Sequence, residues 1–231
     1  MTKIAIVMVN INDYEYYREF NELKDKDLVD WYYFTDKNIS SKFWNVKNIN
    51  NINEIKDYDN RLKCKYIKMN THLLLPNYKY YLWIDGSFPI QNNNFINDLY
   101  FLISQRPEIV LYIHNARRKE RNIKNEVLRC SKLKSVDNNL INLQYNNYIL
   151  EGYPDKKGVL FSSGIILKEN NSKINNLMDY WFKQNEMYTT RDQVSLPYSL
   201  WKCEVIPKII NENINLNSLV GKKHMKSRKS R

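Results

Sequence analysis

The sequence is short of cysteine, glycine and proline, with 3, 5 and 6 of these residues among 231. Cys64, Cys130 and Cys203 lie far apart, are odd in number and include no Cys-x-x-Cys pair. A disulfide framework or a cysteine-based zinc site is therefore not expected, and a reducing compartment is predicted. No linker rich in Pro, Gly or Ser divides the chain, and its length suits one domain whose core needs no cross-link.

Long apolar runs are also missing from the sequence. A membrane-spanning helix needs about 20 consecutive apolar residues, and no run reaches that length. Residues 1–10, MTKIAIVMVN, combine one lysine with a short apolar run and lack the small-residue cleavage site of a signal peptide. We interpret them as a buried first strand, and we expect a cytoplasmic protein.

Acidic residues are outnumbered, with 25 Asp and Glu against 36 Lys and Arg, which gives a net charge of +11. More than half of this excess lies in residues 221–231, GKKHMKSRKSR, which contain six basic residues. We therefore divide the chain into a domain over residues 1–220 and a basic tail over 221–231. Such a tail suits phosphate, nucleic acid or an acidic surface, and it is equally compatible with a solvated end.

What the sequence does contain is a series of short, nearly continuous apolar runs, typical of strands buried on both faces. The runs cover residues 3–9, 29–35, 44–49, 80–84, 109–114, 159–167 and 203–209. Helical patterns separate many of them, over residues 93–105, 116–132 and 172–186. Strands that alternate with helices predict a single α/β domain with a mostly parallel central sheet flanked by helices.

Residues 61–75, RLKCKYIKMNTHLLL, carry basic side chains at helical spacing. Arg61, Lys65, Lys68 and His72 are 4, 3 and 4 residues apart, so they share one face of a predicted helix. One interpretation is a solvated lysine face. The other is an anion site, because an anion placed between like charges offsets their repulsion.

The stretch YYLWIDGSFPI, residues 80–90, ends an aromatic and apolar run in one acid, one glycine and one serine. In open α/β sheets ligands bind beyond the carboxyl ends of the strands, which is where Asp85 is expected. Gly86 permits close backbone approach, and Ser87 points the same way as Asp85 in an extended chain. A lone carboxylate with a neighbouring oxygen suits a divalent cation that takes its other ligands from water and phosphate. The competing interpretation is a turn that ends the strand.

Two further segments place polar residues in apolar surroundings. Asp192, within Arg-Asp-Gln, is a candidate general base for an acceptor hydroxyl. It is equally compatible with a helix cap, because Thr190 and Gln193 have the spacing of a capping box. Ser163 and Gly164 interrupt the apolar stretch GVLFSSGIILKEN, and such a break in a strand often marks a bulge or a bound ligand.

In combination, these segments resemble the TOD/MUCI-type glycosyltransferase-like family, which occurs in bacteria, plants and large DNA viruses. The segments are YYFTD (32–36), Trp44, the basic helix followed by Leu75-Pro76, YYLWIDGS (80–87), IHNARRKE (113–120), GVLFSSGIILKEN (158–170) and RDQVSLPYSLWK (191–202). The resemblance extends from about residue 1 to residue 202, and WIDGS together with RDQVSLPY is its most specific part. It implies a GT-A-like, Rossmann-like nucleotide-sugar transferase domain, located in the host cytoplasm if the chain is viral.

The resemblance also implies a metal site built on an abbreviated Asp-x-Asp motif. Asp85, with Ser87 in place of the second acid, would hold Mn²⁺ or Mg²⁺ against the donor diphosphate. In GT-A enzymes a C-terminal histidine often completes the metal ligands, and His224 is the residue in the tail that corresponds. Lys222 and Lys223 beside it would bind the pyrophosphate.

The remaining implied contacts concern the donor, the acceptor and the chemistry. The candidate catalytic residues are Asp192 and Gln193. The candidate donor contacts are Asp36 near the nucleoside, Lys65, Lys68, Ser163, Gly164, Lys222 and Lys223. The candidate acceptor or sugar contacts are Trp83 and the His-x-x-Arg pair His114 and Arg117, followed by Glu120 or Glu126 as the family's acid.

The predicted activity is transfer of a sugar from a nucleoside diphosphate sugar, with a UDP-sugar favoured, to a hydroxyl of a glycan or protein-linked acceptor. A nucleic-acid-binding module is one alternative, supported by the basic stripe and 18 tyrosines, although no named nucleic-acid motif is present. We therefore expect no nucleic-acid partner. The other alternative is a catalytically inactive glycan-binding homologue, which the serine at position 87 suggests.

Overall fold

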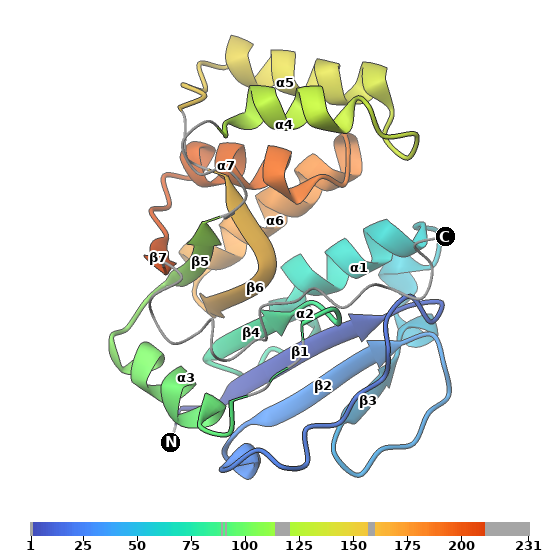
Figure 1. The fold of residues 1–231 in the computed structure, drawn as a ribbon, viewed down its shortest axis with the longest axis vertical. Helices are drawn as coiled ribbons and strands as arrows, with labels where there is room; N and C mark the ends of the chain where they lie inside the picture. The colour runs from blue at the N-terminus through green and yellow to red at the C-terminus, as the bar shows by residue number, and fades with distance from the viewer. Residues whose placement is uncertain (1, 89, 91, 114–120, 157–159, 211–231) are drawn as a thin grey trace.

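The computed structural model describes residues 2–88, 90, 92–113, 121–156 and 160–210, which form a mixed sheet with helices on both faces (Figure 1). The described strands run in the order β3-β2-β1-β4-β6-β5-β7 across one seven-stranded sheet. Their bounds are β1 Ile4–Asn10, β2 Asp30–Thr35, β3 Asn45–Asn48, β4 Tyr80–Ile84, β5 Ile109–Ile113, β6 Phe161–Glu169 and β7 Lys208–Ile210.

Strand direction decides which chain ends meet at each edge of the sheet. β1, β2, β3 and β4 are mutually parallel along the row, and β5 is parallel to β7. β6 is antiparallel to both of its neighbours, β4 and β5. The carboxyl ends of β1, β2 and β4 therefore share one edge with the amino end of β6, and this edge is where an open α/β sheet binds its ligands.

The helices form two groups. Their bounds are α1 Asn60–Met69, α2 Thr71–Leu74, α3 Phe95–Ser104, α4 Ile123–Cys130, α5 Asn138–Leu150, α6 Ser172–Met187 and α7 Asp192–Lys202. α1, α6 and α7 pack their apolar residues on one face of the sheet, and α3 packs on the other. α4 and α5 lie one above the other at one end of the molecule, next to α7 (Figure 1).

Alternation of side chains along β1 explains why its sequence is apolar without interruption. Ile4, Ile6 and Met8 point into the core shared with α3, whereas Ala5 and Val7 point into the core shared with α1, α6 and α7. Successive side chains of a strand face opposite sides, so a strand covered on both faces is apolar at every position. The sheet is therefore fixed from both sides, which keeps its carboxyl edge rigid.

Helix α7 lies between the sheet and the outer helices. Leu196 and Leu200 pack on the sheet side, while Val194 and Tyr198 pack with α4 and α5. The Tyr198 ring stacks on that of Tyr148 with 3.6 Å between centroids. Burial of each such apolar side chain contributes about 1.5–3 kcal/mol. This two-sided packing fixes the direction of α7 and hence the position of its first residue, Asp192.

Comparison with the predicted elements confirms the α/β fold class and most of the strands. The central run 80–84 is β4 itself, while the last run, 203–209, contributes only its end to a short β7. The basic helix is confirmed but is divided into α1 and α2. α5 and α7 were not predicted. α7 packs apolar residues on two sides and contains Pro197, so it has no single apolar stripe, and apolar residues of α5 such as Leu143 and Leu150 are exposed. The boundary after residue 220 and the tail 221–231 lie outside the described residues.

None of the described helices has the length and apolar character needed to cross a membrane.

Candidate functional site

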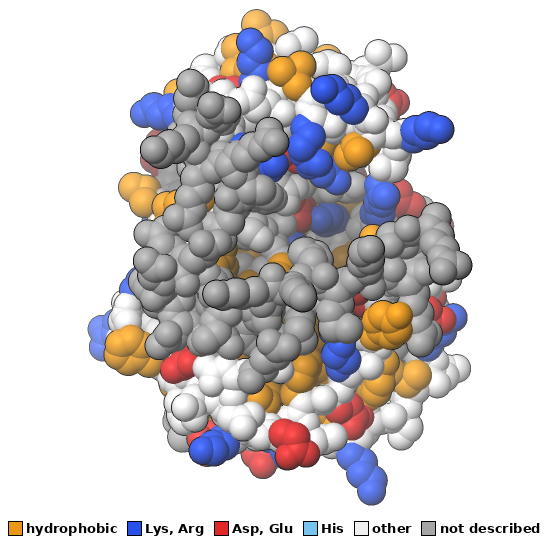
Figure 2. Space-filling model, viewed as in Figure 1, with side chains coloured by type: hydrophobic (Ala, Val, Ile, Leu, Met, Phe, Trp, Pro, Cys, Tyr) orange, Lys and Arg blue, Asp and Glu red, His pale blue; other side chains and the backbone are white. Residues whose placement is uncertain are grey.

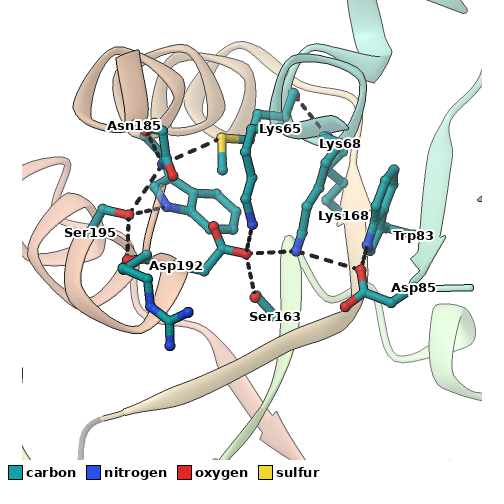
Figure 3. Close-up of polar contacts among 12 residues, drawn as sticks. Lys65, Lys68, Trp83, Asp85, Ser163, Lys168, Asn185, Asp192 and Ser195 are labelled. Atoms are coloured by element: carbon teal, nitrogen blue, oxygen red, sulfur yellow. Dashed lines mark hydrogen bonds and ion pairs between the residues drawn. The ribbon is translucent and has the colours of Figure 1, made fainter. Parts of the chain in front are cut away.

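The candidate site lies at the carboxyl edge of the sheet, where α7 begins. Asp192 is 5 % exposed, and its Oδ2 accepts hydrogen bonds from Lys65 Nζ at 2.5 Å, Lys68 Nζ at 2.9 Å and Ser163 Oγ at 2.7 Å (Figure 3). Asp85, at the end of β4, extends this network, because its Oδ1 lies 3.9 Å from Lys68 Nζ. Four segments far apart in the sequence therefore meet here, namely α1, β4, β6 and α7.

Helix α1 delivers both lysines to the same carboxylate because residues three apart lie on one side of a helix. The Asp59 side chain caps its first turn by accepting a hydrogen bond from Leu62 N at 2.8 Å. The Lys65 side chain remains 18 % exposed, whereas that of Lys68 is only 2 % exposed. A solvated lysine face is thus the wrong interpretation of this stripe for Lys68, which enters the core.

A second buried lysine supports the end of α1. Lys168 Nζ, on β6, donates hydrogen bonds to the carbonyl oxygens of Lys68 at 2.8 Å and Met69 at 2.9 Å. Burial, together with the neighbouring Lys68 charge, lowers the pKa of Lys168 to about 7. A neutral amine has two N–H groups, which match the two carbonyl acceptors. Lys168 therefore holds the backbone from which Lys68 reaches into the site.

Electrostatics keep the Asp192 carboxylate ionised. Burial raises the pKa of Asp192, but the Lys65 and Lys68 ammonium groups outweigh burial and hold that pKa well below its usual range. Burial lowers the pKa of Lys68, and the charges of Asp192 and Asp85 more than reverse this, so the pKa of Lys68 is raised. The network thus contains two fixed cations and two carboxylates. Asp192 Oδ1 is buried and has no hydrogen-bond partner among the described residues.

The N-terminus of α7 is anchored by an arginine. Arg191 is the N-cap residue, and its side chain caps no N–H of the helix in the described chain. Its Nη2 instead lies 3.5 Å from Oε1 of Glu126, a buried carboxylate on α4 that also pairs with Arg121 and Arg129. The capping box that would have given Gln193 a structural role is therefore wrong, and Gln193 lies partly exposed on the first turn of α7.

Asp85 is accessible to solvent, whereas Trp83 is buried. The Asp85 side chain is 38 % exposed, and its Oδ1 accepts a hydrogen bond from Trp83 Nε1 at 2.6 Å. Trp83 is 2 % exposed, with Lys68 Nζ 5.4 Å from its ring centroid. Trp83 was expected to contact the acceptor or sugar. The ring is almost fully buried and contacts the Asp85 carboxylate and Lys68, and a contact of Trp83 with the acceptor or sugar stays a prediction.

The polar break in β6 has two different explanations. Ser163 is buried and binds Asp192, as described above. A Cβ on Gly164 would lie 2.2 Å from Cε2 of the Phe88 ring and 3.1 Å from Asp85 Oδ2. Gly164 therefore lets β6 approach the turn after β4, where its carbonyl accepts a hydrogen bond from Asp85 N at 2.7 Å. A donor contact for Gly164 stays a prediction.

The segment after β1 places Glu15, a residue outside every motif of the sequence, at the carboxyl edge of the sheet. Glu15 lies at this edge because Asn10, the last residue of β1, is hydrogen-bonded in both directions with the Glu15 backbone. Burial and then the Asp85 charge raise the pKa of Glu15 to about 6. Asp36, at the end of β2, accepts hydrogen bonds from Asn12 N at 3.0 and 3.1 Å and so holds the same segment. A lone Glu in a polar stretch, far from WIDGS in sequence, gives no signal that it meets Asp85.

The residues at this edge fit a divalent cation that is held by few protein oxygens. Asp85 presents an accessible carboxylate, and the Ser87 side chain, two positions further on, is buried. Glu15 Oε2 is a buried oxygen without a partner in the described structure. The described residues contain no group of three or more His, Cys, Asp and Glu that could hold a metal ion. A cation here would therefore take its other ligands from donor phosphates and water, as Mg²⁺ usually does.

Figure 2 shows a depression near the middle of the face, with basic and acidic side chains visible in and around it. Two cavities lie elsewhere, at the amino ends of the strands, one beside Val29 and Asn45 and the other beside Lys79 and Tyr80. Ligands of open α/β sheets bind at the opposite edge, so these cavities are not the candidate site.

Several predicted site residues cannot be placed. His114 and Arg117, expected at the acceptor or sugar, and Lys222, Lys223 and His224 in the tail all lie outside the described residues. The structure brings together the others on the carboxyl edge, where Asp85, Ser163, Lys65, Lys68 and Asp192 form one connected group.

Comparison with known proteins gives one family match. The model of one family, described as "TOD1/MUCI70, glycosyltransferase-like domain", matches residues 15–225, which is nearly the whole chain. A search of curated proteins found no match. The match includes Asp85, the lysines of α1 and the Arg-Asp-Gln segment of α7. The chain belongs to the TOD1/MUCI70 family of glycosyltransferase-like domains.

Proposed function

We propose that the protein transfers a sugar from a nucleoside diphosphate sugar, with a UDP-sugar favoured, to a hydroxyl of a glycan or protein-linked acceptor. Family membership supports glycosyl transfer in general. The observation that carries the specific proposal is the group of two lysines and two carboxylates at the carboxyl edge. Such an edge is where an α/β sheet receives a nucleotide, and fixed cations are what a leaving diphosphate requires.

In this reaction the acceptor oxygen forms a bond to the anomeric carbon, and the bond from that carbon to the diphosphate oxygen breaks. Negative charge develops on the diphosphate, and cations held in place before the reaction stabilise it without reorganisation. Lys65 is the accessible member of the pair, and Lys68 adds a buried positive charge between Asp192 and Asp85. Asp85 and Ser87 would hold Mn²⁺ or Mg²⁺, which supplies further charge neutralisation to the diphosphate when bound.

Asp192 has two separable roles in the proposal. Its low pKa makes it a weak base, so its first role is to hold Lys65 and Lys68 in place through its hydrogen bonds. Its unpartnered Oδ1 would take the acceptor proton only if the reaction inverts the anomeric centre. Gln193, on the same first turn and partly exposed, would contact the sugar or the acceptor.

A thermal-shift experiment tests the proposal against its alternatives. UDP-, GDP- and CMP-sugars are added with and without Mn²⁺, and duplex DNA and RNA are tested in parallel by gel shift at several salt concentrations. A UDP-sugar with Mn²⁺ at about 100 times its Kd should stabilise the protein by about 2.7 kcal/mol, which is about 5–10 °C in Tm for a chain of this size. If no donor shifts Tm but nucleic acid binds with steep salt dependence, the protein is a nucleic-acid-binding module.

A further inference from the structure

We infer that Glu15 supplies the second carboxylate of the divalent-cation site, in the position that the second acid of an Asp-x-Asp motif would otherwise serve. The inference rests on the proposed function, since it concerns the cation that Asp85 would hold. It identifies a ligand that lies 70 positions from Asp85 in the sequence and within no recognised motif.

The backbone of Glu15 is fixed at the right edge of the sheet. Asn10 Nδ2 donates to Glu15 O at 2.7 Å, and Glu15 N donates to Asn10 Oδ1 at 2.9 Å. Asn10 is itself buried, as the last residue of β1. β1 and β4 are parallel neighbours, so the chain leaving β1 and the Asp85 turn leaving β4 meet at one edge.

The Glu15 side chain packs directly over the glycine that follows Asp85. A Cβ on Gly86 would lie 2.9 Å from both Cβ and Cγ of Glu15, closer than real Cβ contacts come. Gly86 thus provides the space in which the glutamate stem lies. The turn is held from the other side, because Arg18 Nη1 donates to Gly86 O at 2.8 Å. A side chain at position 86 would therefore collide with this glutamate.

The carboxylate of Glu15 has an unpaired oxygen and lies near a second negative charge. Its Oε2 is buried and has no hydrogen-bond partner in the described parts of the chain, and leaving a buried acceptor unpaired is unfavourable. The nearby charge of Asp85 has the same sign and repels the Glu15 carboxylate, and the weaker opposite effect of the Arg18 charge offsets this only in part. A divalent cation bound between two carboxylates removes both penalties at once.

The chemistry of the donor set agrees with this assignment. Mg²⁺ and related hard cations bind proteins through one or two carboxylates and complete their coordination with water and substrate phosphates. Asp85 and Glu15 make two, while Ser87 offers a neutral oxygen. Serine at position 87 then leaves the site with two acids, because Glu15 supplies the second one from the segment that follows β1.

Titration of the full-length chain with Mn²⁺ tests the inference, with free Mn²⁺ measured by electron paramagnetic resonance, both without nucleotide and with UDP. The variants are Glu15→Gln, Asp85→Asn and the matched control Glu22→Gln, an exposed glutamate of the same segment. Glu15→Gln should weaken Mn²⁺ binding about 10- to 100-fold, because even partners outside the ligand set change metal affinity by that factor. Glu22→Gln should bind as the wild type does, and Tm should be similar for all the proteins.

Three outcomes separate this inference from the function on which it rests. Weakened binding in both Glu15→Gln and Asp85→Asn supports it. Wild-type affinity in Glu15→Gln with weakened binding in Asp85→Asn overturns the assignment of Glu15 and leaves the proposed function intact. If the wild type binds no Mn²⁺ even with UDP, both the cation site and the assignment of Glu15 are wrong. Hydrolysis of a UDP-sugar without added metal then tests the proposed transferase function separately.

Discussion

Replacing Asp85 with asparagine is expected to lower sugar transfer about 100- to 1,000-fold while changing the free energy of unfolding by less than about 1 kcal/mol. Loss of one fixed charge stabiliser from a transition state typically costs about 3–4 kcal/mol, and about 1.4 kcal/mol corresponds to a factor of ten in rate. The fold should survive because Asp85 is 38 % exposed and asparagine Oδ1 can still accept the hydrogen bond from Trp83 Nε1.

The matched control is Asp27→Asn, which removes an exposed carboxylate near the amino end of β2, at the opposite edge of the sheet. This variant should transfer sugar at the wild-type rate. Initial rates and chemical denaturation are measured on the same preparations. Full activity in Asp85→Asn would remove Asp85 from the site, whereas inactivity of both variants would indicate a general effect of charge.

Replacing Asp192 with asparagine is expected to lower the free energy of unfolding by about 3–5 kcal/mol and to abolish transfer. Removing one partner of a buried ion pair leaves the other charge uncompensated, and the Lys68 side chain is only 2 % exposed. The pKa of Asp192 is lowered in the folded protein, so its stabilisation is present above the unfolded pKa of about 3.9 and is lost as pH falls through and below that value. Asp192→Asn should lack this acid-sensitive part of the stability.

Urea denaturation between pH 2 and pH 7 measures this effect, because the loss lies below the unfolded pKa. Glu108→Gln is the control, since its ion pair with Lys173 is about half exposed and should contribute less than about 1 kcal/mol. Adding Lys68→Met to Asp192→Asn should recover at least about 1 kcal/mol, because the uncompensated charge is then gone. Wild-type stability in Asp192→Asn would show that the network is not the buried ion pair described above.

The parts of the fold that could be predicted are those in which the sequence pattern is local. Unbroken apolar runs such as 80–84 indicate strands buried on both faces, and the strand end at Asp85 follows from the abrupt change to Asp, Gly and Ser. The direction of β6 could not be predicted. A strand's apolar pattern is the same whether its neighbours run parallel or antiparallel to it. Only the structure shows that Ser163 contacts Asp192 and that Gly164 contacts Asp85.

The candidate site was predictable where spacing along a helix carries the information. The interval between Lys65 and Lys68 places both on one face, and the structure shows that this face turns toward Asp192. Whether that face is solvated or buried depends on α7 and β6, which are distant in sequence. Glu15 shows the same limit, because its contact with Gly86 comes from a segment 70 residues away and nothing in its own segment marks it.

Acceptor-free hydrolysis of a panel of UDP-, GDP- and CMP-sugars, followed as release of the nucleoside diphosphate or monophosphate, tests the central claim most directly because it requires no knowledge of the acceptor. The account predicts slow release of UDP from at least one UDP-sugar by the wild type and loss of that release in Asp85→Asn. Failure to hydrolyse any donor, or equal rates in the wild type and Asp85→Asn, would contradict it.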